Sequence, residues 1–294
     1  MTGTTRQNSR GMAYIAIGVV LCASATQAAI EKVFTSDGII QTGDIYDKVE
    51  VRDTKPLRTT VNMTGGRVGN PWDPQSGMFT YDSSRVNLSG GSVYCLHTYN
   101  LSEVNISGGL VSFVSFGDTT ISAHDSSTIN LYEGGFIDGG SGSFFRLHDS
   151  STLNVYGGQV GLFLSGDDSS VINIHDGWVF DIGLFKMVNV YGGLIDTFLN
   201  NDYVPEVATI NIYGYGFEYT PHGRWMPPWN GGDAWWISKL TGYGFDGTPI
   251  TWFGLPDPAT NPNINLIPEP ATLLLLGLGG LGLLWKIPLR DSAA

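Results

Sequence analysis

The stretch Val86-Asn87-Leu88-Ser89-Gly90-Gly91 contains the phrase that decides the fold, because it returns along most of the 294-residue chain. An aliphatic residue, Asn, a second aliphatic residue, a variable position and Gly-Gly occur together in six close and two looser copies, 16 to 25 residues apart. The Asn residues of the copies are Asn62, Asn87, Asn105, Asn130, Asn154, Asn173, Asn189 and Asn211. A phrase that repeats at this period is typical of a solenoid.

Each copy of the phrase predicts a short strand followed by a bend. Val86 and Leu88 alternate with Asn87 and Ser89, so that the aliphatic pair faces a core and the polar pair faces outward. The Gly-Gly pair supplies the positive φ angle that lets the chain bend into the next strand. Asp-Ser-Ser stands before several copies, and its side chains can bond to their own backbone and form a turn. These turns begin at Asp82, Asp125, Asp149 and Asp168.

A strand, a bend, a second strand and a polar turn about every 22 residues make one coil of a β-solenoid. We therefore expect an all-β fold, a single-stranded parallel β-helix whose coils are right-handed because parallel crossovers almost always are. At about 4.8 Å between coils, the copies span about 40 Å. A sandwich of hairpins is the alternative, but it does not require identical residues in each unit. In the β-helix, one column of amides bonds from coil to coil: Asn87, Asn105, Asn130, Asn154, Asn173, Asn189 and Asn211.

The repeat also predicts how the chain is divided. The segments are a signal peptide (1–29), an N-terminal cap with an opening coil (30–60), the solenoid repeats (61–214), a Trp- and Pro-rich C-terminal cap (215–266) and a sorting segment with a transmembrane helix (267–294). The ends must differ from the middle, because an open end exposes unpaired strand edges and core. We expect a hairpin from Trp235 to Gly254 and a last strand at Ile264-Asn265-Leu266.

The amino terminus has the composition of a secretory signal. Arg6 and Arg10 precede an apolar run from Met12 to Cys22, and small residues follow. The run is short for a membrane span, so removal by signal peptidase and export are expected. A lipoprotein is disfavoured because Leu21 stands before Cys22, where lipidation requires a small side chain.

The carboxyl terminus combines a proline motif with an apolar run. Pro268-Glu269-Pro270 precedes residues 271–289, in which Lys286 is the one charge. About 20 apolar residues suffice for a helix that spans a bilayer, and the prolines keep the motif extended and accessible. The arrangement resembles the PEP-CTERM sorting signal of exopolysaccharide-producing Gram-negative bacteria. That signal usually ends in clustered arginines, whereas here Lys286 and Arg290 are separated.

The resemblance implies a route of export. It implies that an exosortase-type enzyme recognises Pro268, Glu269 and Pro270, and that the helix anchors the chain transiently in the inner membrane. It implies a final location at the cell surface or in the extracellular matrix. Because it covers only about the last 28 residues, it implies nothing about the activity of the body.

The composition excludes several classes of function. With 15 basic and 27 acidic residues the net charge is −12, which argues against nucleic-acid binding because that function needs clustered Lys and Arg. Forty glycines argue against a helical bundle, since glycine costs about 1 kcal/mol relative to alanine at each helical position. Cys95 is the only cysteine left after signal removal, so we expect a buried thiol and no intramolecular disulfide.

The body shows no sequence pattern for a cofactor or metal. It has no nucleotide-binding loop, zinc spacing or nucleophile elbow. His124-Asp125 and His148-Asp149 share a register, but we interpret them as turn residues rather than as metal ligands. Calcium between Asp125, Asp149 and Asp168 is the alternative, although the calcium-binding β-roll pattern is absent.

The outward face suggests two functions. Tyr132, Tyr156, Tyr191 and Tyr213, with His175 in the same register, are expected to form a stripe beside the Asn column, and flat aromatic rings next to amides favour contact with sugars. We interpret the protein first as a structural or adhesive protein of the matrix or surface. The second interpretation is a module that binds extracellular polysaccharide through this stripe.

A polysaccharide lyase or hydrolase is the third interpretation, and we assign no catalytic residues to it. Asp138, Asp181 and Asp196 follow glycine bends, and Asp181 and Asp196 belong to adjacent coils, so about 5 Å is expected between them. A retaining glycosidase uses such a separation. However, Arg146 and Lys186 are the only permanent cations in these coils, and a uronate lyase needs cations near the substrate carboxylate.

Overall fold

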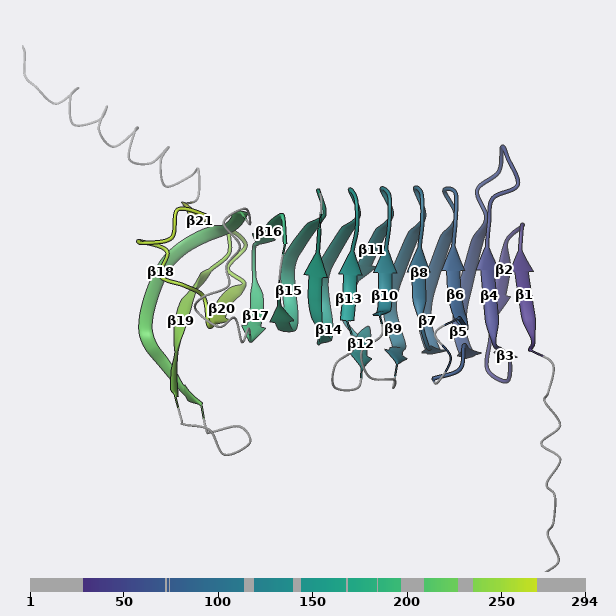
Figure 1. The fold of residues 1–294 in the computed structure, drawn as a ribbon, viewed down its shortest axis with the longest axis horizontal. Helices are drawn as coiled ribbons and strands as arrows, with labels where there is room; N and C mark the ends of the chain where they lie inside the picture. Colours follow the sequence, from purple (N-terminus) through teal and green to yellow (C-terminus); the bar gives the residue numbers. More distant parts are fainter. Residues whose placement is uncertain are drawn as a thin grey trace, which may run out of the picture.

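The coordinates are a computed structural model that describes residues 29–268, apart from 72, 74, 114–118, 140–143, 168, 184, 197–208 and 227–234. This part of the chain forms 21 strands and no helix, so the fold is all-β. Most strands pair in parallel with the equivalent strand of the coil before and the coil after, and the coils stack along the long axis of the molecule (Figure 1). Three parallel stacks of strands result, one for each side of a coil.

The first stack carries the repeated phrase, and we name it the Asn face. The phrase aligns without offset from coil to coil, so that Val86 pairs with Val61 on one side and with Val104 on the other. Its strands are β2 (Gly38–Ile40), β5 (Thr60–Val68), β7 (Arg85–Val93), β9 (Glu103–Phe113), β11 (Thr128–Leu131), β14 (Thr152–Gly166), β15 (Val171–Ile182), β16 (Met187–Val190), β18 (Thr209–Met226) and β21 (Ile264–Pro268).

The second stack follows the glycine bend, and we name it the second face. In the longer strands of the Asn face, the residues beyond the bend belong to it, so that Val68 pairs with Val93 and Val93 with Val111. Its separate strands are β3 (Ile45–Tyr46), β12 (Phe136–Gly139), β17 (Gly193–Asp196) and β20 (Pro249–Phe253).

The third stack precedes the polar turn, and we name it the variable face because its outward residues change from coil to coil. It continues into the last residues of β14 and β15, where Leu147 pairs with Gly166 and Phe163 with Asp181. Its separate strands are β1 (Glu31–Phe34), β4 (Lys48–Val51), β6 (Gly77–Thr80), β8 (Leu96–Thr98), β10 (Thr119–Ala123) and β13 (Phe144–Leu147).

One hydrophobic core runs inside the coils. Val86 and Leu88 are buried, whereas Asn87 between them is partly exposed, as the alternation of the phrase predicts. The core receives aliphatic side chains from all three faces, for example Ile106, Val111 and Ile121. Cys95 is fully buried, as expected.

The glycine bends join the Asn face to the second face. The backbone of Gly91 has φ of 87°, a left-handed conformation that L side chains rarely adopt. A Cβ atom at Gly91 would also lie 2.7 Å from the carbonyl oxygens of Gly65 and Gly66 in the preceding coil. The bend therefore requires glycine twice, once for its φ angle and once for the close approach of two coils.

The polar turns also have the predicted form. Asp82, Asp125 and Asp149 have φ angles of 57° to 60°, and short polar side chains tolerate this conformation because they bond locally. Asn100 occupies the same place in the coil between them, with φ of 59°. Asp168, the fourth predicted turn residue, lies outside the described residues.

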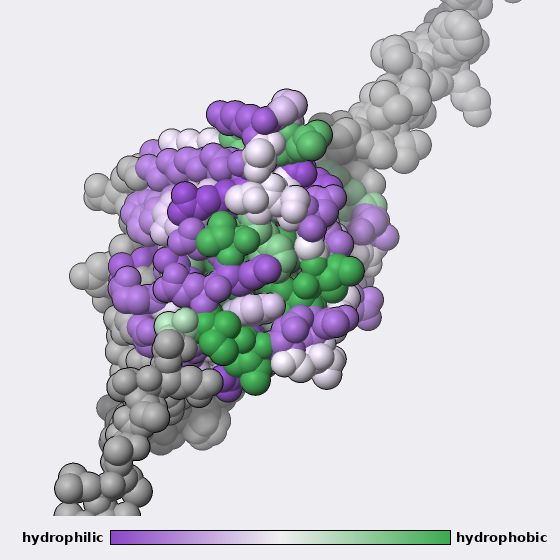
Figure 2. Space-filling model, turned by 90° about the vertical axis from the view of Figure 1, so that its right-hand side faces the viewer, coloured by the Kyte–Doolittle hydropathy of each residue, from purple (hydrophilic) through white to green (hydrophobic). Residues whose placement is uncertain are grey.

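At the N-terminal end of the stack, the described strands of the first coil have a neighbour on one side only. Among the described residues, β1 pairs only with β4, and β2 and β3 pair only with β5. Figure 2 looks onto this end and shows apolar surface between polar side chains. Exposed apolar side chains of the first coil include Val33, Ile39 and Ile45. The first coil thus covers the core behind it but leaves apolar groups at the surface.

The opposite end is built from antiparallel strands (Figure 1). The predicted hairpin is present, because β19 (Trp235–Tyr243) pairs antiparallel with β20 and also with β18. β20 then returns to the stack beside β17, and β21 adds the predicted last strand beside β18. Trp252 on β20 is fully buried opposite Ile195 and so extends the core into the last coil.

Candidate functional site

The predicted Asn column forms and is longer than expected. In eight successive pairs the side-chain Nδ2 of one Asn donates to Oδ1 of the Asn in the preceding coil, over 2.8 to 3.0 Å. Asn62 begins the column and Asn265 ends it. Each inner amide uses one of its two N–H donors and one of its two Oδ1 lone pairs within the column, so these bonds hold neighbouring coils together along the whole stack.

The predicted Tyr stripe also forms, but its rings stack on one another. The ring centroids of Tyr156, His175, Tyr191 and Tyr213 follow each other at 4.6 to 4.7 Å, and Tyr132 adds a ring at 5.3 Å from Tyr156. The planes of neighbouring rings differ by 5° to 19°. We name these five residues the Tyr column.

Stacking limits what the Tyr column can bind. The rings of Tyr156, His175 and Tyr191 are covered on both faces, so a sugar can reach only their edges and polar atoms. Burial raises the pKa of Tyr191, with a further contribution from Tyr213, and burial lowers the pKa of His175. Tyr132 is 38% exposed and Tyr156 43%. Binding of a glycan by Tyr132, Tyr156, Tyr191 and Tyr213 stays a prediction.

A second column of rings stands beside the polar turns. Tyr81, Tyr99, His124 and His148 stack at 4.6 to 5.1 Å, with planes within 10° of parallel. The guanidinium of Arg52 lies 4.5 Å from the ring centroid of Tyr81 at one end. At the other end, Nδ1 of His148 lies 3.0 Å from a carboxylate oxygen of Asp167. We name the four rings the turn column.

The turn column explains the two predicted His-Asp pairs. His124 and His148 do share a register, but they contact each other as stacked rings. Burial lowers the pKa of His124, and the neighbouring His148 adds to this because two stacked imidazolium ions would repel each other.

The carboxylates of the same turns accept backbone hydrogen bonds. Asp125 accepts from the backbone nitrogen of Asn100 over 2.8 Å, and Asp149 accepts from that of Asp125 over 2.9 Å. The predicted turns form, but these carboxylates bond to the turn of the preceding coil rather than to their own backbone, and so tie one turn to the next. No group of three or more His, Cys, Asp or Glu residues in the described part of the chain is arranged to hold a metal ion.

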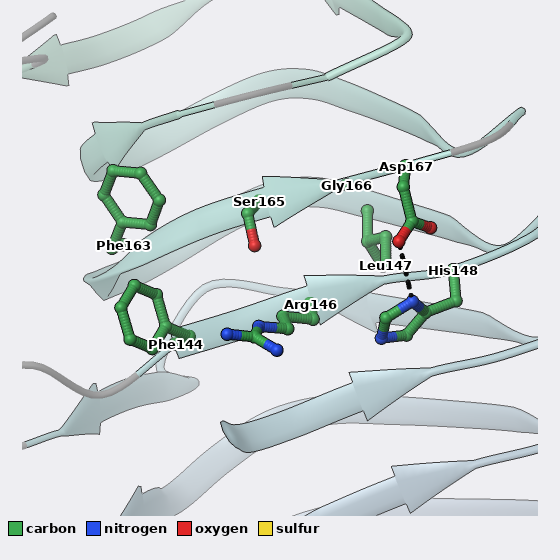
Figure 3. Close-up of a pocket in the computed structure, with 8 residues that line it drawn as sticks. All are labelled: Phe144, Arg146, Leu147, His148, Phe163, Ser165, Gly166 and Asp167. Carbon is green, nitrogen blue, oxygen red and sulfur yellow. Dashed lines mark hydrogen bonds and ion pairs between the residues drawn. The ribbon is translucent and has the colours of Figure 1, made fainter. Parts of the chain in front are cut away.

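A cavity of about 320 Å³ lies on the variable face, where β13 meets the end of β14 (Figure 3). The rings of Phe144 and Phe163 stand edge to face at one end, 5.5 Å apart. The guanidinium of Arg146 lies 5.2 Å from the ring centroid of Phe144. The remaining lining residues are Leu147, His148, Ser165, Gly166 and Asp167. The cavity therefore joins an apolar end to a polar end that includes the last ring of the turn column.

The carboxylates considered for catalysis are not register partners. Asp181 pairs with Phe163 on the variable face, whereas Asp196 pairs with Phe253 on the second face. The expected pairing of Asp181 with Asp196 is therefore wrong. The reason is the register of β15 with β17: Val179 pairs with Ile195, so that Asp196 follows its paired neighbour by one residue and Asp181 follows its own by two.

The sorting motif begins at the end of the described chain. Pro268 is exposed and is the last residue of β21. Residues 266–290 match the family model of the PEP-CTERM protein-sorting motif. The chain carries a PEP-CTERM motif. No curated protein and no solved structure matches the chain.

The PEP-CTERM motif indicates an exported protein that an exosortase sorts to the cell surface of a Gram-negative bacterium. Glu269, Pro270 and the expected membrane helix at 271–289 lie outside the described residues. Within the part that is described, the structure has no helix long and apolar enough to span a bilayer.

Sequence reasoning missed the turn column and the cavity on this PEP-CTERM chain. The turn column had a recognisable signal, because a ring residue directly precedes the turn residue in Tyr81-Asp82, Tyr99-Asn100, His124-Asp125 and His148-Asp149. The cavity had none, since its lining comes from segments 144–148 and 163–167, which both lie outside the repeated phrase.

Proposed function

We propose that this PEP-CTERM chain is a structural or adhesive protein of the cell surface or extracellular matrix, and that its body is a single-stranded, right-handed parallel β-helix. The observation that carries the proposal is the unbroken Asn column, whose amides bond from Asn62 to Asn265. Such a column holds neighbouring coils together. A rigid rod with mutually bonded outward groups suits a spacer or scaffold better than it suits an enzyme.

Two further features support the β-helix. The parallel register of the phrase continues from Val61 to Ile210. Level-to-level backbone bonds also tie the turns, as from Leu101 to Asp82 and from Ser126 to Asn100. The hand is proposed from the general preference of parallel crossovers.

The proposed route to the surface uses both ends of the chain. Signal peptidase removes residues 1–29, the helix at 271–289 anchors the chain transiently in the inner membrane, and the exosortase acts at Pro268, Glu269 and Pro270. Pro268 is the last residue of β21 and is exposed, which supports access of such an enzyme to the motif that begins there.

The route is tested in a host that contains an exosortase. Replacement of Pro268 and Glu269 by alanine is expected to leave a larger, membrane-bound form and to abolish the processed surface form, measured by immunoblotting of cell fractions. Pro262→Ala is the matched control, because Pro262 is an exposed proline just before the last strand. Processing of the double variant at the wild-type level contradicts the proposed sorting site.

The structural role is tested by deletion of the gene. Loss of the protein is expected to weaken attachment of cells or retention of their matrix, while the release of reducing ends from matrix polysaccharide stays unchanged. Unchanged attachment and matrix retention contradict the structural proposal. Product release that depends on the purified protein points to a lyase or hydrolase.

A glycan-binding role along the Tyr column is the second candidate, favoured by the exposed edges of Tyr132 and Tyr156. The double variant Tyr132→Ala, Tyr156→Ala is expected to lose retention on the polysaccharide of the host. Tyr215→Ala, Tyr243→Ala is the control, because these rings form a similarly exposed stacked pair at the C-terminal end. Equal retention of both double variants contradicts a binding role for the column.

A further inference from the structure

The cavity between β13 and the end of β14 differs from the Asn face because its central polar groups, Arg146 and Ser165, do not repeat one residue type from coil to coil (Figure 3). Ser122, Arg146 and Ser165 follow one another at one outward position of the variable face. A hydroxyl, a guanidinium and a hydroxyl cannot form the repeating donor-to-acceptor pattern that the Asn column uses. This break in the repeat leaves Arg146 facing solvent.

Arg146 is also unlike Arg52, Arg58 and Arg85 of the first coils. Arg52 bonds to Glu50, and Arg58 and Arg85 both bond to Glu103. Among the described residues, Arg146 forms no ion pair within 4.0 Å and instead lies over the ring of Phe144. Contact with an aromatic ring fixes the orientation of the guanidinium group, while its N–H groups remain able to donate hydrogen bonds to a ligand.

The other lining groups are suited to a sugar. Phe144 and Phe163 form an apolar wall at one end of the cavity, and His148 and Asp167 form a polar pair at the other. Arg146 and Ser165 lie between the two ends (Figure 3). From residue 144 to residue 148 the strand rises about 13 Å, at about 3.3 Å per residue. The volume of about 320 Å³ falls within the range of small-molecule sites.

We propose that this cavity binds a carboxylate-bearing sugar, a uronate unit within an acidic polysaccharide. The carboxylate accepts two hydrogen bonds from the guanidinium of Arg146, which matches it in planar geometry. Ser165 and Asp167 bond to sugar hydroxyls, and the C–H face of the ring packs on Phe144. The inference rests on the proposed exposure of the body to extracellular polysaccharide, but it uses a different surface from the Tyr column.

The test measures binding of a short oligogalacturonate to the purified full chain in detergent, by isothermal titration calorimetry. Arg146→Gln is expected to weaken binding at least about tenfold, because a charge-assisted bidentate contact is lost, and Arg146→Lys is expected to restore only part of it. Lys186→Gln is the matched control, since Lys186 is an exposed cation that does not line the cavity. It is expected to bind as the wild type does. Because Arg146 is exposed, the thermal unfolding of all variants should be unchanged.

Two further probes define the ligand. The methyl ester of the same oligogalacturonate is expected not to bind, because it lacks the carboxylate charge, and an equal concentration of inorganic phosphate is expected not to displace the acid form. Absence of binding by the wild type, equal binding by Arg146→Gln, or equal binding of the ester overturns the proposal, as does displacement by phosphate. Binding that survives Arg146→Gln but is lost in Tyr132→Ala, Tyr156→Ala overturns it in favour of the Tyr column. None of these outcomes alters the separate test of sorting at Pro268.

Discussion

The Asn face and the variable face belong to the same coils but use their outward positions differently. On the Asn face each level repeats one amide, and every amide from Asn87 to Asn211 donates to one neighbour and accepts from another. On the variable face the corresponding column is Glu50, Phe79, His97, Ser122, Arg146 and Ser165. A repeated polar group bonds to its own copies along the whole stack, whereas changing groups bond only where neighbours match, as Nδ1 of His97 and Oγ of Ser122 do over 2.6 Å. The repeated face therefore builds the rod, and the variable face leaves Arg146 without an ion pair among the described residues.

The largest loss of stability is expected from a substitution at a glycine bend of the Asn face, where neighbouring coils approach each other closely. Gly91→Ala combines a positive φ with three backbone atoms at 2.7 Å from the new Cβ, and is expected to lower the free energy of unfolding by about 3 kcal/mol or more. Gly43→Ala is the control, because Gly43 also has a positive φ but nothing within 4 Å of its Cβ position. It should cost about 1 kcal/mol. Similar losses in urea denaturation would show that coil spacing at the bend is not the cause.

On the variable face, His97 predicts a dependence on pH. Burial lowers the pKa of His97 to about 4, and repulsion from His124 adds to this. The unfolded chain takes up this proton near pH 6.5 and the folded chain only near pH 4. Stability is therefore lost as the pH falls through this window, by at most about 3 kcal/mol.

The comparison uses His97→Gln, which removes the titrating ring and its stacking on Phe79. The variant should be less stable at pH 7 but should lose less stability between pH 7 and pH 4.5, measured by urea unfolding at each pH. Because His124 and His175 titrate in both proteins, the difference isolates His97. Parallel pH curves would mean that His97 gains its proton as readily in the folded chain as in the unfolded one.

Loss of an amide should cost more stability in the middle of the Asn column than at its end. Asn130→Ala leaves the Oδ1 acceptor of Asn105 and the Nδ2 donor of Asn154 without their partners, and Asn130 is only 8% exposed. We expect a loss of about 2 kcal/mol, because buried polar groups that lose a partner cost about 1 to 3 kcal/mol. Asn265→Ala removes one exposed bond at the end and should cost less than about 1 kcal/mol. Equal effects on the midpoint of denaturation would mean that the inner amides find water instead.

The Tyr column should contribute least. Tyr156→Leu keeps apolar bulk but removes stacking on Tyr132 and His175, and is expected to cost about 1 kcal/mol, since the ring is partly exposed. Thermal unfolding monitored by circular dichroism measures this cost. A loss as large as that of Asn130→Ala would make the rings, and not the amides, the main tie between the coils.

Much of the fold could be predicted from the sequence because the phrase carries local and long-range information together. The alternation of apolar and polar residues from Val86 to Ser89 predicts a strand and shows which side chains point into the core. The recurrence of Asn aligns one coil with the next. Asn265 was recognisable as a last strand for the same reason. The expected pairing of Asp181 with Asp196 was wrong, because it placed both carboxylates at the same distance after the glycine bend, whereas Asp181 lies two residues beyond Val179 and Asp196 one residue beyond its partner Ile195.

The sequence by itself determined the repeat, the amide column, the glycine bends and the sorting address, since each depends on residue type at a fixed place in a short segment. Only the tertiary structure decided that the Tyr and His rings stack on one another, because ring separation follows from the rise between coils. It also decided that Arg146 shares a cavity with Phe163 and Asp167. Those residues meet across two coils of unequal length on a face without a repeat, and no local pattern encodes that alignment.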